Sequence, residues 1–208
     1  MNVVDRLLRD RRASTAAEFG LVLPLLLLLI FGVIDAGRLL YNVNQAEKAT
    51  QMGARYAIVT DVIPAALVSF DYVGTTYCTN ATSTPCVAGD AIDQTAALGT
   101  LRCTSTACNC TGTCPSGASI DAAAFTNLVT RMQAMMPQIV AANVVVSFRG
   151  SGLGYAGDPN GMEIVPLVTV ELQSLQFTPI TALALTTFTL PAFQTTLSAE
   201  SAVGTQSN

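Results

Sequence analysis

The sequence of 208 residues predicts an α+β protein: a long amino-terminal transmembrane helix that continues as a stem, then a small antiparallel β-sheet head with one further helix. Three observations lead to this prediction. An apolar block fills residues 14–34, helical spacing continues from it to about residue 60, and strand-like alternation begins near residue 144. A chain of this length has room for one domain and an anchor.

Charge is unevenly distributed along the chain. Arg6, Arg9, Arg11 and Arg12 make residues 1–13 a basic leader, whereas the rest carries 6 basic and 12 acidic residues, a balance of −6. The net charge of −4 argues against a nucleic-acid partner, which would need a basic face. Because Lys and Arg stay on the cytoplasmic side of a membrane helix, we expect a cytoplasmic amino terminus and a head beyond the membrane.

The apolar block is long enough to cross a bilayer. Glu18 and Asp35 enclose 16 uncharged residues, and the low-polarity span from Ser14 is about 21 residues, close to what a hydrocarbon layer of about 30 Å requires. Pro24 predicts a kink, because it removes one backbone hydrogen bond. A cleavable signal peptide would need small residues after the block, and Ile34-Asp35-Ala36 is a poor site. A plain signal anchor leaves Glu18 unexplained.

A leader that is cut before the block explains Glu18. Cleavage between Ala13 and Ser14 leaves a positive amine on Ser14 and makes Glu18 the fifth residue of the mature chain. A carboxylate at a membrane edge is costly unless a cation or a hydrogen-bond donor accompanies it. In staggered parallel helices the amine of one subunit meets Glu18 of its neighbour, which sets the register. The alternative is that Glu18 only caps a helix at the headgroup level.

The segment RRASTAAEFGLVLPLLLLLIFGVIDAGRLLYNVNQAEKATQMGARYA resembles the TadE-like family of pseudopilins, which are encoded with tight-adherence (Flp-type) pilus machineries. The family pattern is a basic leader, Glu-Phe, apolar residues with a proline, then an acidic residue, Gly-Arg and an aromatic. It covers about 45 residues here. The matching positions are Arg11, Arg12, Glu18, Phe19, Pro24, Asp35, Gly37, Arg38 and Tyr41.

The resemblance implies a pilin-like protein of the bacterial inner membrane. A prepilin peptidase would trim the leader, although Ala13 stands where glycine is commoner, and a cut after Ser14 would make Glu18 the fourth residue. Membrane lipid, other pilins or pseudopilins and the pilus assembly machinery are the implied partners, and no cofactor is implied. Glu18 and Phe19 would serve assembly. Asp35, Arg38 and Tyr41 would flank the membrane interface.

Beyond the membrane we expect a stem, a cysteine-rich loop and a head. Apolar and small residues recur every three to four positions over 35–60, which predicts an amphipathic stem helix. The range 61–117 reads as a long loop pinned by disulfides in an oxidising compartment, because its Cys spacing lacks paired C-x2-C zinc ligands. Fifteen pairings are possible. The cysteines are Cys78, Cys86, Cys103, Cys108, Cys110 and Cys114.

The range 118–208 predicts the α+β head. A helix over 120–136, with Ser119 as its cap, ends at Pro137. Strands follow over 144–148, 164–172 and 188–199, and Pro166 indicates an edge or a bulge. The segment SLQFTPITAL between the last two strands reads as a turn followed by a short helix.

No catalytic or metal site is expected. Without histidine, Ser-His and Cys-His nucleophile pairs are impossible. The Gly-rich range 149–163 lacks the helix that a phosphate loop opens onto, so we read it as a hairpin loop. Asp158, Asn160 and Glu163 are oxygen donors without the spacing of a calcium loop. The sequence therefore favours a structural pseudopilin. The alternative is a membrane-anchored extracytoplasmic binding domain or hydrolase unrelated to pili.

Overall fold

The structure is a computed structural model, and it falls into two compact units. The amino-terminal unit comprises residues 1–43 and 176–188, and the head unit comprises residues 44–175 and 189–208. The residues that the structure describes are 11–79, 85–93, 97–116, 119–159, 161–180 and 187–199.

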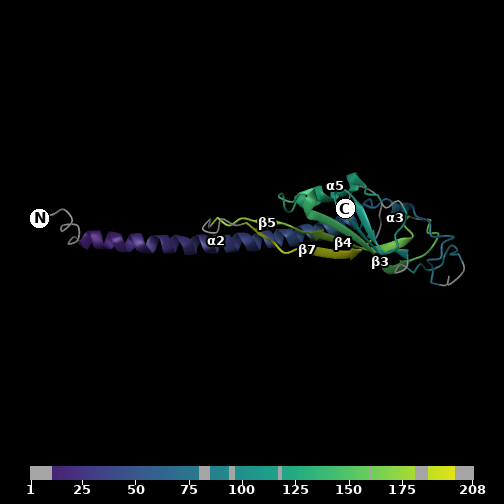
Figure 1. Cartoon of the computed structure of the whole chain (residues 1–208), viewed down its shortest axis with the longest axis horizontal. Helices are drawn as coiled ribbons and strands as arrows, with labels where there is room; N and C mark the ends of the chain where they lie inside the picture. Colours follow the sequence, from purple (N-terminus) through teal and green to yellow (C-terminus); the bar gives the residue numbers. More distant parts are fainter. Residues whose placement is uncertain are drawn as a thin grey trace. The chain divides into compact units, whose positions relative to one another are not determined.

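The first described element is α2 (Arg11–Ala57), which contributes residues to both units (Figure 1). It runs through Pro24 without a break in the helix; the kink expected there stays a prediction. Among the described residues, α2 is the one helix that is long and apolar enough to cross a membrane, and its most apolar stretch is not buried at all. The predicted helix that continues from the apolar block into a stem is confirmed.

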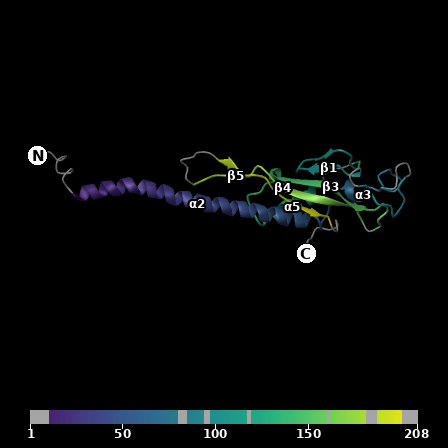
Figure 2. The ribbon, with the colours of Figure 1, turned by 90° about the horizontal axis from the view of Figure 1, so that it is seen from below.

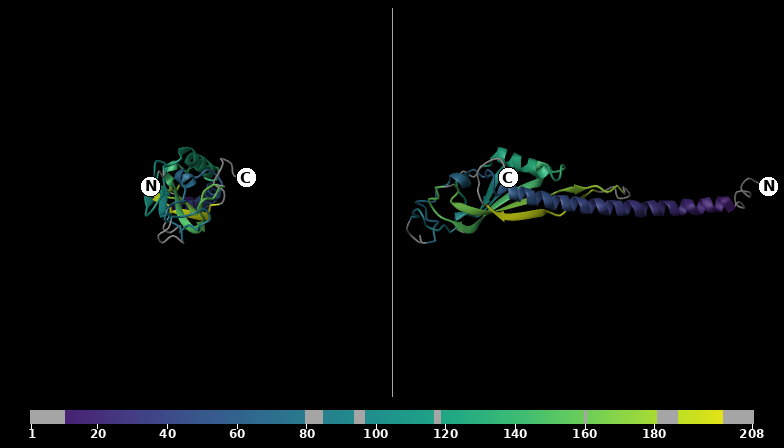
Figure 3. Two further views of the ribbon diagram at one scale, coloured as in Figure 1. Left: turned by 90° about the vertical axis from the view of Figure 1, so that its right-hand side faces the viewer. Right: turned by 180° about the vertical axis from the view of Figure 1, so that it is seen from behind.

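The head unit contains a five-stranded antiparallel sheet in the order β2-β1-β3-β4-β7. Helix α5 (Ala122–Gln133) lies along one side of this sheet (Figure 3), and the short helix α3 (Ala66–Ser69) precedes it in the chain. The predicted α+β layout is therefore confirmed. The strands are β1 (Thr100–Cys103), β2 (Cys108–Thr111), β3 (Val144–Gly154), β4 (Ile164–Leu172) and β7 (Phe193–Ser198).

The head core forms where α2, α5 and β4 meet. Side chains alternate along β4, so that Val168, Val170 and Leu172 are all buried on one face. A Cβ atom placed on Gly53 of α2 would lie 2.9 Å from Met132 Cγ and 3.2 Å from Val170 Cγ1. Small residues on α2 therefore allow close packing. The small buried residues of this half of α2 are Ala46, Ala49, Thr50, Ala54 and Ala57.

Part of the range 61–117 is a β-hairpin, so the expectation of a loop is wrong there. Strands β1 and β2 pair antiparallel, and β1 extends the main sheet with Leu101 opposite Phe148 of β3. Leu101 and Cys103 are buried while the residues before them are exposed. Two strands of four residues each give too short an alternation to be recognised in a region rich in Thr, Gly and Ser.

Helix α5 begins later than predicted because a different residue caps it. The Asp121 carboxylate accepts hydrogen bonds from the amides of Ala123 (2.8 Å) and Ala124 (3.0 Å). Asp121 is thus the N-cap in place of Ser119. Ile120, expected inside the helix, instead forms an isolated β-bridge with Pro64.

Proline explains two further features of the strands. Pro166 pairs with Gly150 directly before an irregularity in β3, and β4 has a neighbour on each side, so the bulge alternative holds and the edge alternative does not. The strand expected over 188–199 is split, because the extended stretch is interrupted around Pro191.

The two short strands β5 (Gln176–Phe177) and β6 (Phe188–Thr189) form a separate two-stranded sheet. We call residues 176–180 and 187–189 the hairpin. Its base is closed by the Leu190 amide, which donates to the Leu175 carbonyl at 2.7 Å. Figure 2 shows β5 beside α2. The turn and short helix expected here are replaced by β5 at residues 176–177; residues 181–186 lie outside the described residues.

Candidate functional site

The amino-terminal half of α2 exposes large apolar side chains on every side. Leu21 is 78% exposed, Leu25 71% and Leu29 65%. A soluble helix would bury one stripe of such residues against a core. Glu18 lies on this surface and is exposed, and its neighbour Phe19 is 63% exposed.

The predicted leader joins this helix directly. The backbone is helical at Ala13 and Ser14, and α2 begins at Arg11. Residues 1–10 lie outside the described residues. The cleavage between Ala13 and Ser14, and the roles of Glu18 and Phe19, therefore stay predictions.

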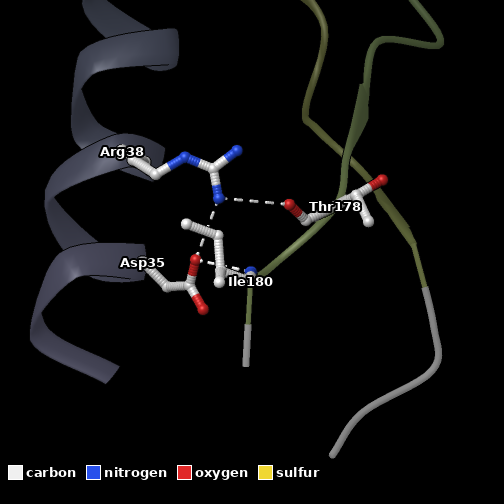
Figure 4. A network of polar contacts seen from close by, with 4 residues as sticks. All are labelled: Asp35, Arg38, Thr178 and Ile180. Atoms are coloured by element: carbon white, nitrogen blue, oxygen red, sulfur yellow. Dashed lines mark hydrogen bonds and ion pairs between the residues drawn. The ribbon is translucent and has the colours of Figure 1, made fainter. Parts of the chain in front are cut away.

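A polar network lies just past the apolar block (Figure 4). Asp35 Oδ1 accepts hydrogen bonds from the Ile180 amide at 2.7 Å and from Arg38 Nη1 at 3.0 Å. The same Arg38 nitrogen also lies 3.4 Å from the carbonyl oxygen of Thr178, to which it donates. Helical spacing of three residues brings the Asp35 and Arg38 side chains to one face of α2. The network attaches the hairpin to α2.

The hairpin covers Asp35 and half-covers Arg38. Asp35 is only 8% exposed, whereas the Arg38 side chain is 44% exposed. The Arg38 guanidinium lies over the ring of Phe177 with its carbon 5.5 Å from the ring centre, a cation–π contact. Phe177 is buried and packs against Phe188, with ring centres 5.1 Å apart. Asp35 is thus shielded from water, and the half-exposed Arg38 contacts polar and aromatic partners.

Only part of this network could be predicted from the sequence. Asp35, Arg38 and Tyr41 were expected as interfacial flanks; the first two meet in the network, whereas Tyr41 is 63% exposed. The interfacial role of all three stays a prediction. The hairpin was missed as their partner because its contacts with Asp35 join residues 145 positions apart, which no local pattern reports.

All six cysteines are paired in the structure, in agreement with the expectation of disulfides. Each bond closes a short loop: the two cysteines are separated by 8, 5 and 4 positions respectively. The second bond links β1 to β2 across their hairpin. The pairs are Cys78–Cys86, Cys103–Cys108 and Cys110–Cys114.

Glu163 and Tyr72 form a buried polar contact in the head. Glu163 is 8% exposed, and its carboxylate accepts a hydrogen bond from the Tyr72 amide at 3.0 Å. The Tyr72 side chain is fully buried, and among the described residues its hydroxyl has no hydrogen-bond partner. Burial raises the pKa of Tyr72 above its ordinary value, and the charges of Glu163 and Tyr77 add to this.

The oxygen donors considered for calcium do not form a described site. The Glu163 carboxylate accepts a hydrogen bond from the Tyr72 amide, and Asn160 lies outside the described residues. Among the residues that the structure describes, no group of three or more Cys, Asp or Glu side chains is arranged to hold a metal ion.

Comparison with known proteins gives one match. The model of the TadE-like protein family matches residues 13–55, the range that contains the apolar block, Asp35, Arg38 and most of the stem. No curated protein and no solved structure matches the chain. The resemblance expected from the sequence is confirmed over this range. Residues 13–55 are thus similar to the TadE-like family, and they include the membrane-length apolar stretch and most of the stem.

Proposed function

We propose that the chain is a minor pseudopilin that takes part in the assembly of a tight-adherence (Flp-type) pilus. The observation that carries the proposal is the coincidence of two findings on one helix. The TadE-like match covers residues 13–55, and the same residues include an exposed apolar stretch long enough to span a bilayer. The protein acts as a structural component and not as an enzyme.

The proposed topology is a single pass through the inner membrane with a cytoplasmic amino terminus. The basic leader supports this orientation, since Lys and Arg are retained on the cytoplasmic side. The three disulfides support a head in the periplasm or outside the cell, because disulfides persist in oxidising compartments.

Glu18 is proposed to set the register between subunits. A prepilin peptidase cuts between Ala13 and Ser14, and the new amine of one subunit pairs with Glu18 of the next. A charged side chain at the centre of a bilayer costs about 3 kcal/mol on insertion scales, so pairing near the membrane edge favours one axial offset between neighbouring helices. The helix packs against neighbouring pilin helices through small residues, and Phe19 serves assembly beside Glu18.

The test is Glu18→Gln in the full-length protein, in cells that assemble the pilus. Gln keeps the size of the side chain and removes the charge, so we expect normal membrane insertion and strongly reduced pilus assembly, measured by surface pilin and electron microscopy. Glu47→Gln is the matched control, because Glu47 is exposed on the same helix beyond the apolar block. Assembly that is equally normal in both variants would remove Glu18 from the mechanism.

A further inference from the structure

We propose that the hairpin (176–180 and 187–189) is a second membrane-contacting element, which rests on lipid at the outer boundary between acyl chains and headgroups. This inference rests on the proposed insertion of α2 in a membrane. It adds to a single spanning helix a β-hairpin that covers the polar pair at the end of the span.

The length of the apolar block places Asp35 at or inside that boundary. The 16 uncharged residues between Glu18 and Asp35 rise by about 24 Å as a helix, and a typical hydrocarbon layer is about 30 Å thick. With Glu18 at the inner boundary, Asp35 lies within the outer acyl region, and Arg38, about 30 Å from Glu18 along the helix, lies at its outer edge. If the inner boundary lies instead at Ser14, about 6 Å closer to the amino terminus along the helix, Asp35 reaches the outer edge of the hydrocarbon layer.

Charged groups at this depth need partners, and the hairpin provides them. Asp35 accepts a hydrogen bond from the Ile180 amide, and Arg38 donates one to the Thr178 carbonyl. The two charged side chains therefore satisfy two backbone groups of the hairpin. Backbone that enters a membrane must find its hydrogen bonds within the protein. The network is therefore suited to an apolar environment for both α2 and the hairpin.

The outward surface of the hairpin is uncharged: it exposes Ile180 and Phe188 among the polar residues Gln176, Thr178, Thr187 and Thr189. Ile180 is 54% exposed and Phe188 is 42% exposed, while Phe177 faces inward over Arg38. The chain has no charged residue between Glu171 and Glu200, a run of 28 residues that contains the whole hairpin. An element that carries no charge and exposes Ile and Phe avoids the cost of placing charge in lipid.

Lipid is the occupant that these observations favour over a second protein chain. The exposed Ile180 lies beside the apolar surface of α2, on which Val33 is 66% exposed and Ile34 44% exposed. Ile180 is held at the level of Asp35 by its amide, directly beyond this surface. A bilayer that surrounds the apolar block of α2 would therefore contact the hairpin at the level of Asp35.

The test uses the full-length protein in nanodiscs loaded with one chain each. A polarity-sensitive fluorophore is attached at Ile180→Cys or, separately, Phe188→Cys; the native cysteines are all paired, so the new thiol is labelled selectively. Lipids that carry a spin label near the headgroup report contact by quenching. Leu29→Cys is the control for the span and Val140→Cys, 55% exposed in the head, is the control for water.

We expect blue-shifted emission and quenching by the lipid spin label at Ile180→Cys and Phe188→Cys, and quenching by aqueous iodide at Val140→Cys. Hairpin probes that behave like Val140→Cys, while Leu29→Cys is quenched by deeper lipid labels, would overturn this inference and leave the anchor intact. A Leu29→Cys probe in water would overturn the membrane insertion itself. A blue shift that appears only with two chains per disc would make a second copy the occupant, against the proposal.

Discussion

The two halves of α2 carry opposite kinds of surface. In residues 15–34 the large side chains are exposed, as in Leu25 at 71%. In residues 44–57 small side chains are fully buried, as in Ala46 and Ala49 at 0%. One continuous helix thus carries a surface suited to lipid and a surface suited to a protein core.

This difference shows that hydropathy alone does not determine what a helix contacts. Where no protein covers the helix, large apolar residues on all sides match acyl chains. Where the helix packs on a sheet, small residues such as Gly53 let the backbones approach. Asp35 and Arg38 lie between the two halves.

The largest effect is expected at Gly53 of α2, and the same substitution at Gly32 is its control. Gly53→Leu forces new atoms against Met132 and Val170, so we expect the head to lose about 3 kcal/mol of unfolding free energy. Gly32→Leu meets nothing within 4 Å of its Cβ and should leave head stability unchanged. Chemical denaturation of the full-length protein in detergent, followed by circular dichroism, measures both. Equal losses would contradict the contrast between the two halves.

The next largest effect is expected in the polar network of Asp35 and Arg38, which lies between the two halves of α2. Asp35→Ala removes the acceptor of the Ile180 amide and the partner of Arg38, and we expect a local loss of about 1–3 kcal/mol, the range for an unsatisfied buried group. The hairpin should become sensitive to limited proteolysis while the head sheet stays folded.

Asp121→Ala is the control for that experiment, since it removes a helix cap in the head at a cost of about 1 kcal/mol. It should leave proteolysis of the hairpin unchanged. Unchanged cleavage in Asp35→Ala would show that the hairpin is held by other contacts.

A smaller effect is expected from a hydroxyl at the buried face of the stem. Thr50 accepts a hydrogen bond from Thr195 at 3.1 Å, and Thr50→Val should cost about 1 kcal/mol, the net value of a typical hydrogen bond. Thr126→Val removes a hydroxyl from an exposed position of α5, so its thermal unfolding midpoint should move less. A larger shift at Thr126 would contradict the tight packing of the stem.

The smallest effect, with the opposite sign, is expected at Tyr72. Tyr72→Phe removes a buried hydroxyl without a partner among the described residues, so stability at neutral pH should be unchanged or about 1 kcal/mol higher. Because the pKa of Tyr72 is raised in the folded state, the wild type keeps full stability below the ordinary tyrosine pKa near 10 and loses it as pH rises above that value.

The variant should lose less stability than the wild type over that alkaline range. Unfolding midpoints measured against pH check both expectations. A marked destabilisation of Tyr72→Phe at neutral pH would show that the hydroxyl is satisfied.

The sequence predicted the elements whose signals are local and long. The apolar run and the helical spacing located α2, and strict alternation located β4 at residues 164–172. The strands β1 and β2 were missed because each is only four residues long. The cap of α5 was misplaced because Ser119 and Asp121 are both good caps, and packing decides between them. The contact of the hairpin with Asp35 depends on tertiary structure alone.

The most direct test is the mass of the mature amino terminus, determined on protein purified from cells that contain the prepilin peptidase. We expect a chain that begins at Ser14, four residues before Glu18. A chain that keeps Met1 in those cells would contradict it and favour a plain membrane anchor, and a chain that begins near Gly37 would identify an ordinary secreted protein.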